Sequence, residues 1–174
     1  MSEKPVRNAL GWETRARGAC PCLAEPMETG DGLLARIVPT GLIPIDAFAA
    51  LCAAARTHGN GQMEITARGS LQVRGLNETS APRLASAVET LDFAFDEHVP
   101  VIANPLPTEP AARIRASGIA SATRAAIAGR ALCLAPKVSV VIDDGGPISL
   151  DTLAADIRLR AVEPSESSGL AVSL

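Results

Sequence analysis

The stretch 57–76 constrains the fold more than any other part of the chain, because turn and strand signals follow one another in it without a break. Two glycines and an asparagine at 59–61 end a preceding helix, since these residues tolerate a positive φ angle. Apolar and polar residues then alternate over 63–68 and, after a Gly-Ser turn, over 71–74. The expected inner face of the first strand is Met63, Ile65 and Ala67. The two strands should present four potential anion contacts on one surface: Thr66, Arg68, Gln72 and Arg74.

Apolar spacing on both sides of this stretch places it inside a larger unit. Residues 33–39 are typical of a strand, and 44–58 of a helix whose apolar residues recur at intervals of three and four. A second helix is expected over 78–91. The order strand, helix, strand, strand, helix is that of a ferredoxin-like half-domain, an α+β fold, to which we assign residues 17–92. Its helices should cover one face of the sheet and leave the polar face free for a ligand or a second domain.

The remainder of the chain predicts a partial second α+β subdomain over 93–162. Prolines alternate with short apolar runs up to Pro110 and allow extended structure but not a helix. An alanine-rich helix is expected over 117–134, followed by strands over 138–143 and 156–161 in one sheet. The ends, 1–16 and 163–174, are predicted to be a flexible tail and an exposed tail.

Composition excludes several functional classes. The chain has 47% hydrophobic residues, a net charge of −3 and no tyrosine, so it should fold and should not attract nucleic acid. The N-terminal residues lack the apolar core of a signal peptide, and no apolar run approaches the ~18 residues of a membrane span. These features predict a soluble cytoplasmic protein that binds neither nucleic acid nor membrane.

Four cysteines provide the candidate metal ligands. Cys20 and Cys22 lie one residue apart, so that their thiols could bind a soft metal or pair transiently. A cluster built from all four is disfavoured, because Cys52 and Cys133 lie in apolar stretches where cysteine acts as a small hydrophobe. Cys20 and Cys22 therefore remain weak candidates, and no metal site is assigned.

Several motifs together resemble the nitrite and sulfite reductase family, in its ferredoxin-like half-domain, and are most similar to the branch that acts in aerobic cobalamin biosynthesis. They are Arg17-Gly-Ala-Cys-Pro, His58-Gly-Asn-Gly, Glu64-Ile-Thr-Ala-Arg, Leu71-Gln-Val-Arg-Gly-Leu, Ala135-Pro-Lys-Val-Ser-Val-Val-Ile-Asp-Asp-Gly-Gly and Ala155-Asp-Ile-Arg-Leu-Arg. The resemblance covers most of residues 17–162. It implies a half-domain followed by part of a reductase-type second subdomain.

The resemblance also implies a function and a set of binding residues. Arg68 and Lys137 match the anion-binding positions of the family, and with Arg74 they would meet the acidic side chains of the tetrapyrrole precorrin-3A. The implied reaction is an oxygen-dependent hydroxylation with lactone formation, catalysed by an oxidoreductase of the monooxygenase type. Catalytic residues are not identified. An arginine and a second lysine of the reductases are replaced here, by residues 99–100 and by Ser139, which argues against sulfite or nitrite reduction.

Cofactors and partners are implied in the same way. Family members join two such halves, and the cysteines of their [4Fe–4S] cluster lie in the second half. The resemblance leaves open a non-haem iron or sirohaem in the full enzyme. The expected partner is a second half-domain or a second copy of the chain. Two hypotheses stay open: the chain is the N-terminal part of a longer enzyme, or it is a non-catalytic module that binds a tetrapyrrole or a protein. A fragment of a sulfite or nitrite reductase is a further alternative.

Overall fold

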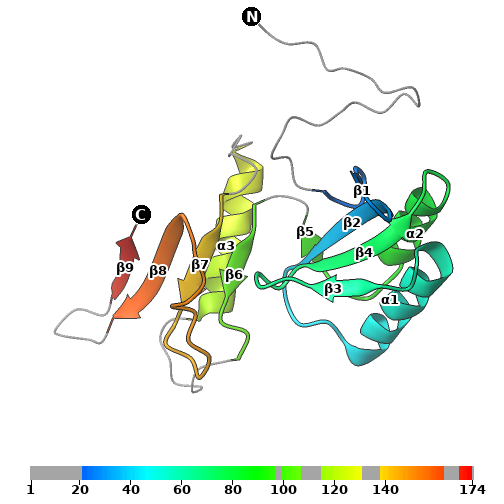
Figure 1. The fold of residues 1–174 in the computed structure, drawn as a ribbon. Helices are drawn as coiled ribbons and strands as arrows, with labels where there is room; N and C mark the ends of the chain where they lie inside the picture. The colour runs from blue at the N-terminus through cyan, green and yellow to red at the C-terminus, as the bar shows by residue number, and fades with distance from the viewer. Residues whose placement is uncertain (1–20, 97–98, 107–114, 131–137, 163–168, 174) are drawn as a thin grey trace, which may run out of the picture.

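The computed structural model describes residues 21–96, 99–106, 115–130, 138–162 and 169–173. These residues form two α+β units, each built on its own sheet (Figure 1). The structure confirms the predicted fold class, because strand, helix, strand, strand and helix follow one another in the first unit. Within the described ranges, no helix is long and apolar enough to cross a bilayer.

The first unit is an antiparallel sheet covered by two helices. Its strands lie in the order β1 (Met27–Thr29), β2 (Gly32–Pro39), β4 (Leu71–Leu76) and β3 (Met63–Ile65), and β5 (Phe95–Asp96) pairs with the end of β2. The helices α1 (Ile45–His58) and α2 (Ser80–Glu89) pack against each other. Both helices contribute to one apolar core with the sheet, so they cover the same face.

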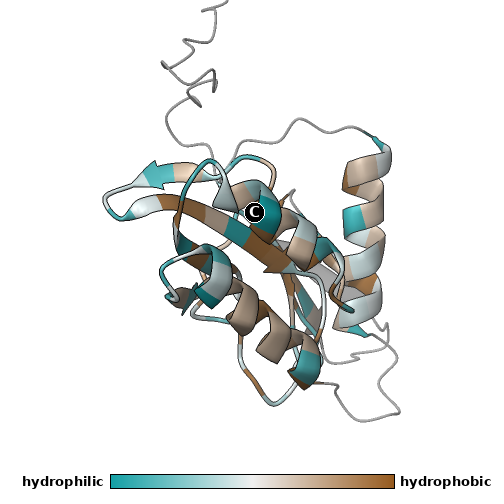
Figure 2. Ribbon diagram, turned by 90° about the vertical axis from the view of Figure 1, so that its right-hand side faces the viewer, coloured by the Kyte–Doolittle hydropathy of each residue, from teal (hydrophilic) through white to brown (hydrophobic). Residues whose placement is uncertain are grey.

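Alternation along the central strands separates this core from the open face. Ala35 and Ile37 of β2 lie opposite Val73 and Leu71 of β4, and all four are buried beneath the helices. The intervening pair, Arg36 and Gln72, points to the other face because successive side chains of a strand alternate. The same alternation is visible as hydrophilic and hydrophobic bands along the sheet in Figure 2.

The burial predicted for the inner face of the first strand needs correction. Met63 is half-buried, but Ile65 is 68% exposed, and Ala67 lies beyond the strand in an exposed turn. Ile65 pairs with the buried Leu71, so its face was predicted correctly. β3 is an edge strand only three residues long, and its end lies outside the cover that the helices give to β4.

The second unit is a mixed sheet with one helix packed against it. Its strands are β6 (Val101–Ala103), β7 (Val140–Asp143), β8 (Ile157–Val162) and β9 (Gly169–Ser173), in that order, with the first three parallel and the last antiparallel. The helix α3 (Ala116–Gly129) packs on β6 and β7 and carries few strongly hydrophilic residues (Figure 2, upright helix). All four residues of β7 are buried, as expected for a central strand of a parallel sheet.

Two boundaries differ from those expected. β5 extends the first sheet to Asp96, beyond residue 92. Gly169–Ser173 form β9 and pair with β8, although 163–174 were predicted to be an exposed tail. Both strands are short and satisfy backbone groups of a longer strand beside them, so their existence depends on that neighbour and not on a pattern of their own. The predicted helix end at 134 lies outside the described residues.

Candidate functional site

The hairpin loop between β3 and β4, residues 66–70, carries Arg68. The loop is closed on both sides, since Thr66 N–H donates to the Ser70 carbonyl and Gly69 N–H donates to the Thr66 carbonyl, each at 2.9 Å. The hydroxyl groups of Thr66 and Ser70 lie 2.7 Å apart. Gly69 has a φ angle of +72°, which glycine adopts without strain. Arg68 is therefore an exposed arginine on a short, well-fixed loop.

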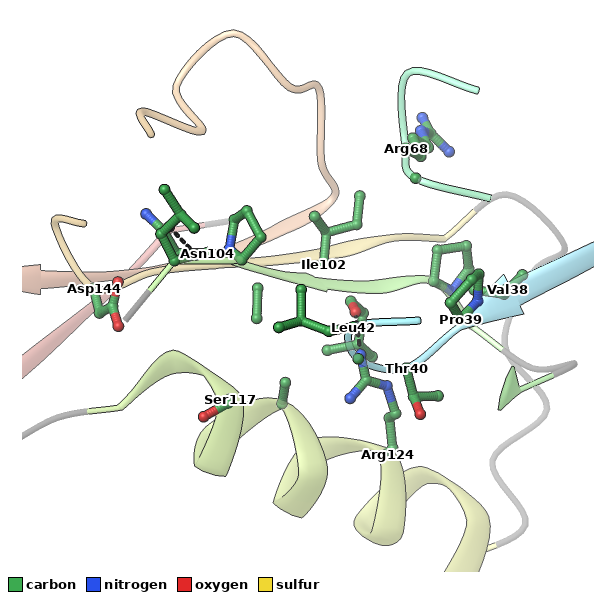
Figure 3. A pocket seen from close by; sticks show the side chains of 18 of the residues that line it. Val38, Pro39, Thr40, Leu42, Arg68, Ile102, Asn104, Ser117, Arg124 and Asp144 are labelled. Atoms are coloured by element: carbon green, nitrogen blue, oxygen red, sulfur yellow. Dashed lines mark hydrogen bonds between the residues drawn. The ribbon is translucent and has the colours of Figure 1, made fainter. Parts of the chain in front are cut away.

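A cavity of about 400 Å³ lies between the two units, and Arg68 is part of its wall. The first unit contributes the end of β2, the loop that follows it and the hairpin. The second unit contributes β6 with its flanking residues, one face of α3 and the residue after β7. Figure 3 shows Arg68 on the hairpin loop on one side of β6 and α3 on the other side. Most of the lining is apolar and includes Val38, Pro39, Leu42, Ile102 and Leu106.

The charged residues of the lining give the cavity a positive character. Among the residues that the structure describes, they are Arg68, Arg115, Arg124 and Asp144, which is three cations and one carboxylate in a protein whose net charge is −3. Arg68 forms no ion pair within the described part of the chain. Apolar walls combined with arginines suit an organic anion, because the walls remove apolar surface from water while guanidinium groups bind carboxylates.

Arg124 projects from α3 into this cavity. One of its N–H groups donates to the Val101 carbonyl at 2.6 Å, which connects the helix to β6. Burial lowers the pKa of Arg124, and the negative charge of Asp96 partly opposes this shift. The guanidinium is thus partly desolvated while most of its five donors have no partner in the described residues.

Asp144 lies at the other end of the cavity (Figure 3). One carboxylate oxygen accepts the N–H of Ala116 at 3.1 Å and so satisfies the first turn of α3. The other oxygen is buried and has no hydrogen-bond partner among the described residues. Nearby, the Asn104 side chain donates to the Ile148 carbonyl at 2.8 Å and accepts the Leu106 N–H at 3.2 Å, which fixes the loops on this side.

Arg74, a predicted binding residue, is held in an ion-pair cluster away from the cavity. Its guanidinium donates twice to Asp31, with Nε–Oδ2 and Nη2–Oδ1 distances of 3.0 and 2.9 Å, and Nη1 lies 3.4 Å from Glu64. Asn60 also donates to Asp31, at 3.2 Å. Hydrogen bonds from Arg74 and Thr29 hold the pKa of Asp31 well below its usual range, and Asp31 raises the pKa of Arg74. We therefore assign Arg74 to the fold, not to a ligand.

The structure does not bring the other predicted residues together. The Thr66 hydroxyl is engaged within the hairpin, and Gln72 lies half-buried on the open face of the sheet, outside the cavity lining. Lys137 and Cys20 lie outside the described residues. Cys22 is half-buried. Among the residues that the structure describes, no group of three or more His, Cys, Asp or Glu could hold a metal ion.

Sequence reasoning missed the second wall of the cavity. Ser117, Ala120 and Arg124 recur at intervals of three and four residues and share one helical face. This spacing, which places an arginine beside small residues on an alanine-rich helix, is the signal that was present. It did not reveal that the face is turned toward the first unit.

Comparison with known proteins supports the resemblance inferred from the motifs. Residues 25–91 match the family described as the nitrite/sulfite reductase ferredoxin-like half domain. A curated relative, a precorrin-3B synthase from Sinorhizobium sp, is 49% identical over 150 residues, which are 84% of this chain and 33% of the relative. The chain therefore spans about a third of that relative's length. Residues 25–91 thus belong to the nitrite/sulfite reductase ferredoxin-like half-domain family, and the chain is a relative of precorrin-3B synthase.

Proposed function

We propose that this chain is the tetrapyrrole-binding part of an oxidoreductase of the precorrin-3B synthase type. The observation that carries the proposal is the apolar cavity between the units, where the described residues of the lining include three arginines and one aspartate. The similarity to a precorrin-3B synthase over 150 residues supports the same class of ligand. The proposed reaction is the oxygen-dependent hydroxylation of precorrin-3A with lactone formation.

The chain's contribution is binding and orientation. A cavity of about 400 Å³ takes one edge of the macrocycle, with a carboxylate side chain directed at Arg68. A guanidinium can hold a carboxylate through two parallel hydrogen bonds, and this fixes the direction of the ring as well as its position. The apolar lining contributed by β6 and by the segment after β2 contacts the ring face and excludes water from the ion pair.

In this proposal, electron transfer needs a [4Fe–4S] cluster, which the family resemblance places in a second half. A [4Fe–4S] cluster requires four thiolates, and the described residues contain no suitable group of ligands. In this proposal the cluster, which supplies electrons when bound, and any non-haem iron or sirohaem are held by a second half. The chain binds that half or a second copy of itself. Binding occurs in the cytoplasm.

Two alternatives are less well supported. Sulfite or nitrite reduction needs a dense ring of positive charge around a small anion. Here the cavity is lined by the uncharged Pro100, one of the two residues that replace an arginine of the reductases. Ser139 is fully buried, and its hydroxyl lies 3.2 Å from the carboxylate of Asp156, so it contributes nothing to the cavity. A non-catalytic tetrapyrrole-binding module would use the same cavity and differ only in the absence of turnover.

The experiment assays the chain alone and after mixing with a fragment of the Sinorhizobium relative that lacks the matched third. Precorrin-3A is supplied with a reductant under labelled O₂, and the product is analysed by mass spectrometry. We expect tetrapyrrole binding in both samples and labelled product in the mixture. Binding without labelled product in either sample would favour the non-catalytic module. Consumption of sulfite or nitrite without tetrapyrrole turnover would contradict the proposal.

A further inference from the structure

The face of α3 that lines the cavity is built to project one long cationic side chain. Ser117 and Ala120 are small, so Arg124, one turn after Ala120 on the same face, extends past them into open space. The fold holds it there through a 2.6 Å hydrogen bond to the carbonyl of Val101 in β6. The position of the guanidinium is thus fixed by both α3 and β6.

Within the part of the chain that the structure describes, this guanidinium uses few of its hydrogen-bond donors. Arg124 is half-buried, and the hydrogen bond to Val101 uses one of its five donors. Burial lowers its pKa because the charge loses contact with water, and Asp96 returns part of this stabilisation through its charge. A desolvated cation with unused donors gains more from an incoming anion than an exposed one does, since less water has to be displaced.

Arg68 lines the cavity from the hairpin and Arg124 from α3, and in Figure 3 they lie on different sides of β6, with Leu42 and Thr40 beside Arg124. Asp144, which repels an anion, lies at the far end. We propose that Arg124 is a second ligand-contacting residue, which binds an acid group of the tetrapyrrole other than the one that Arg68 binds and so selects ligands that carry several carboxylates. This inference rests on the proposed function and names a specificity residue for it.

The test is a fluorescence titration of uroporphyrin, an eight-carboxylate tetrapyrrole, with the full chain and two variants of this position. Arg124→Gln removes the charge but keeps an amide donor, and we expect its affinity to fall tenfold to a hundredfold, the effect of one charge-assisted contact. Arg124→Lys keeps the charge and should lose less. The matched control is Arg130→Gln, an exposed arginine at the end of the same helix and outside the cavity lining, whose affinity should not change.

A measurement on unaltered protein covers the case in which Arg124→Gln does not fold. An arginine-selective dicarbonyl reagent is applied with and without uroporphyrin, and modification of each arginine is measured by mass spectrometry. We expect bound uroporphyrin to protect Arg124 from modification and to leave the modification of Arg130 unchanged. Undiminished modification of Arg124 in the saturated complex, or equal affinities of Arg124→Gln and the unaltered chain, would overturn the inference. Absence of uroporphyrin binding by the unaltered chain would instead count against the proposed function itself.

Discussion

Replacement of Gly75 by alanine tests how the ion-pair cluster around Arg74 is assembled. Gly75 has a φ angle of +69°, and a β-carbon there would lie 2.5 Å from Cβ and Cγ of Asn60. The normal separation of such carbons is about 3.5–4.0 Å, so Asn60 has to move. Asn60 donates to Asp31 at 3.2 Å and accepts the Gln62 N–H at 2.9 Å, so the movement also disturbs two hydrogen bonds.

The expected cost follows from these contacts. A residue with a β-carbon in the left-handed region costs about 1–2 kcal/mol. Disturbing two exposed hydrogen bonds adds about 0.5 to 1 kcal/mol each, at the lower end of the usual range. We expect Gly75→Ala to lower the free energy of unfolding by about 2–4 kcal/mol, which corresponds to a fall in Tm of about 5–15 °C for a protein of this size.

A matched glycine separates the two contributions. Gly69 has a φ angle of +72°, and a β-carbon there would meet nothing within 4 Å. Gly69→Ala should therefore show the backbone cost alone, about 1–2 kcal/mol. Both variants are measured by urea and thermal unfolding. Equal losses for Gly69→Ala and Gly75→Ala would refute the claim that close packing of Asn60 against Gly75 holds the cluster in place.

Three further predictions concern acid sensitivity, the core and iron. The pKa of Asp31 lies below its ordinary value of 3.8, so its ion pair stabilises the fold above about pH 3.8 and is lost as the pH falls below that value. The Tm difference between the native chain and Asp31→Asn should therefore shrink in acid. A Tm difference that does not depend on pH would contradict this. Leu84→Ala, at a fully buried site, should lower the free energy of unfolding in urea by about 2–5 kcal/mol. Ile65→Ala, at a side chain that is 68% exposed, should lower it by less than about 1 kcal/mol. Similar losses in the two variants would be inconsistent with the observed core. The anaerobically purified chain should show no iron–sulfur absorption, and analysis that finds about four irons and four sulfides per chain would place the cluster here.

Local pattern was sufficient to predict the elements of the first unit. Alternation over 71–74 identified β4, and the glycine after Arg68 identified the hairpin loop that carries this side chain. Each of these features depends on neighbours within a few residues. The type of fold followed from their order, because a strand, helix, strand, strand, helix sequence has few compact arrangements.

The partners of the arginines could not be predicted in this way. Arg74 and Asp31 are 43 residues apart in the sequence, and their pairing depends on the position of the β1–β2 turn beside β4. Arg124 lines the cavity because α3 faces the first unit, which no pattern within the helix encodes. The alternation placed Arg68 and Arg74 together among the potential anion contacts on one surface. Only the tertiary structure separates the arginine that has a partner from the one that faces a cavity.

The most direct test of the account compares these two arginines in one titration. Uroporphyrin affinity and Tm are measured on the same samples of the unaltered chain, Arg68→Ala, Arg74→Ala and the surface control Arg83→Ala, which lies exposed on α2. We predict that Arg68→Ala binds uroporphyrin tenfold to a hundredfold more weakly and has an unchanged Tm. Arg74→Ala should have a lower Tm and a nearly normal affinity below that temperature. Arg83→Ala should change neither the affinity nor the Tm. An Arg68→Ala protein that melts several degrees lower but binds uroporphyrin normally would contradict the assignment of the cavity as the tetrapyrrole site.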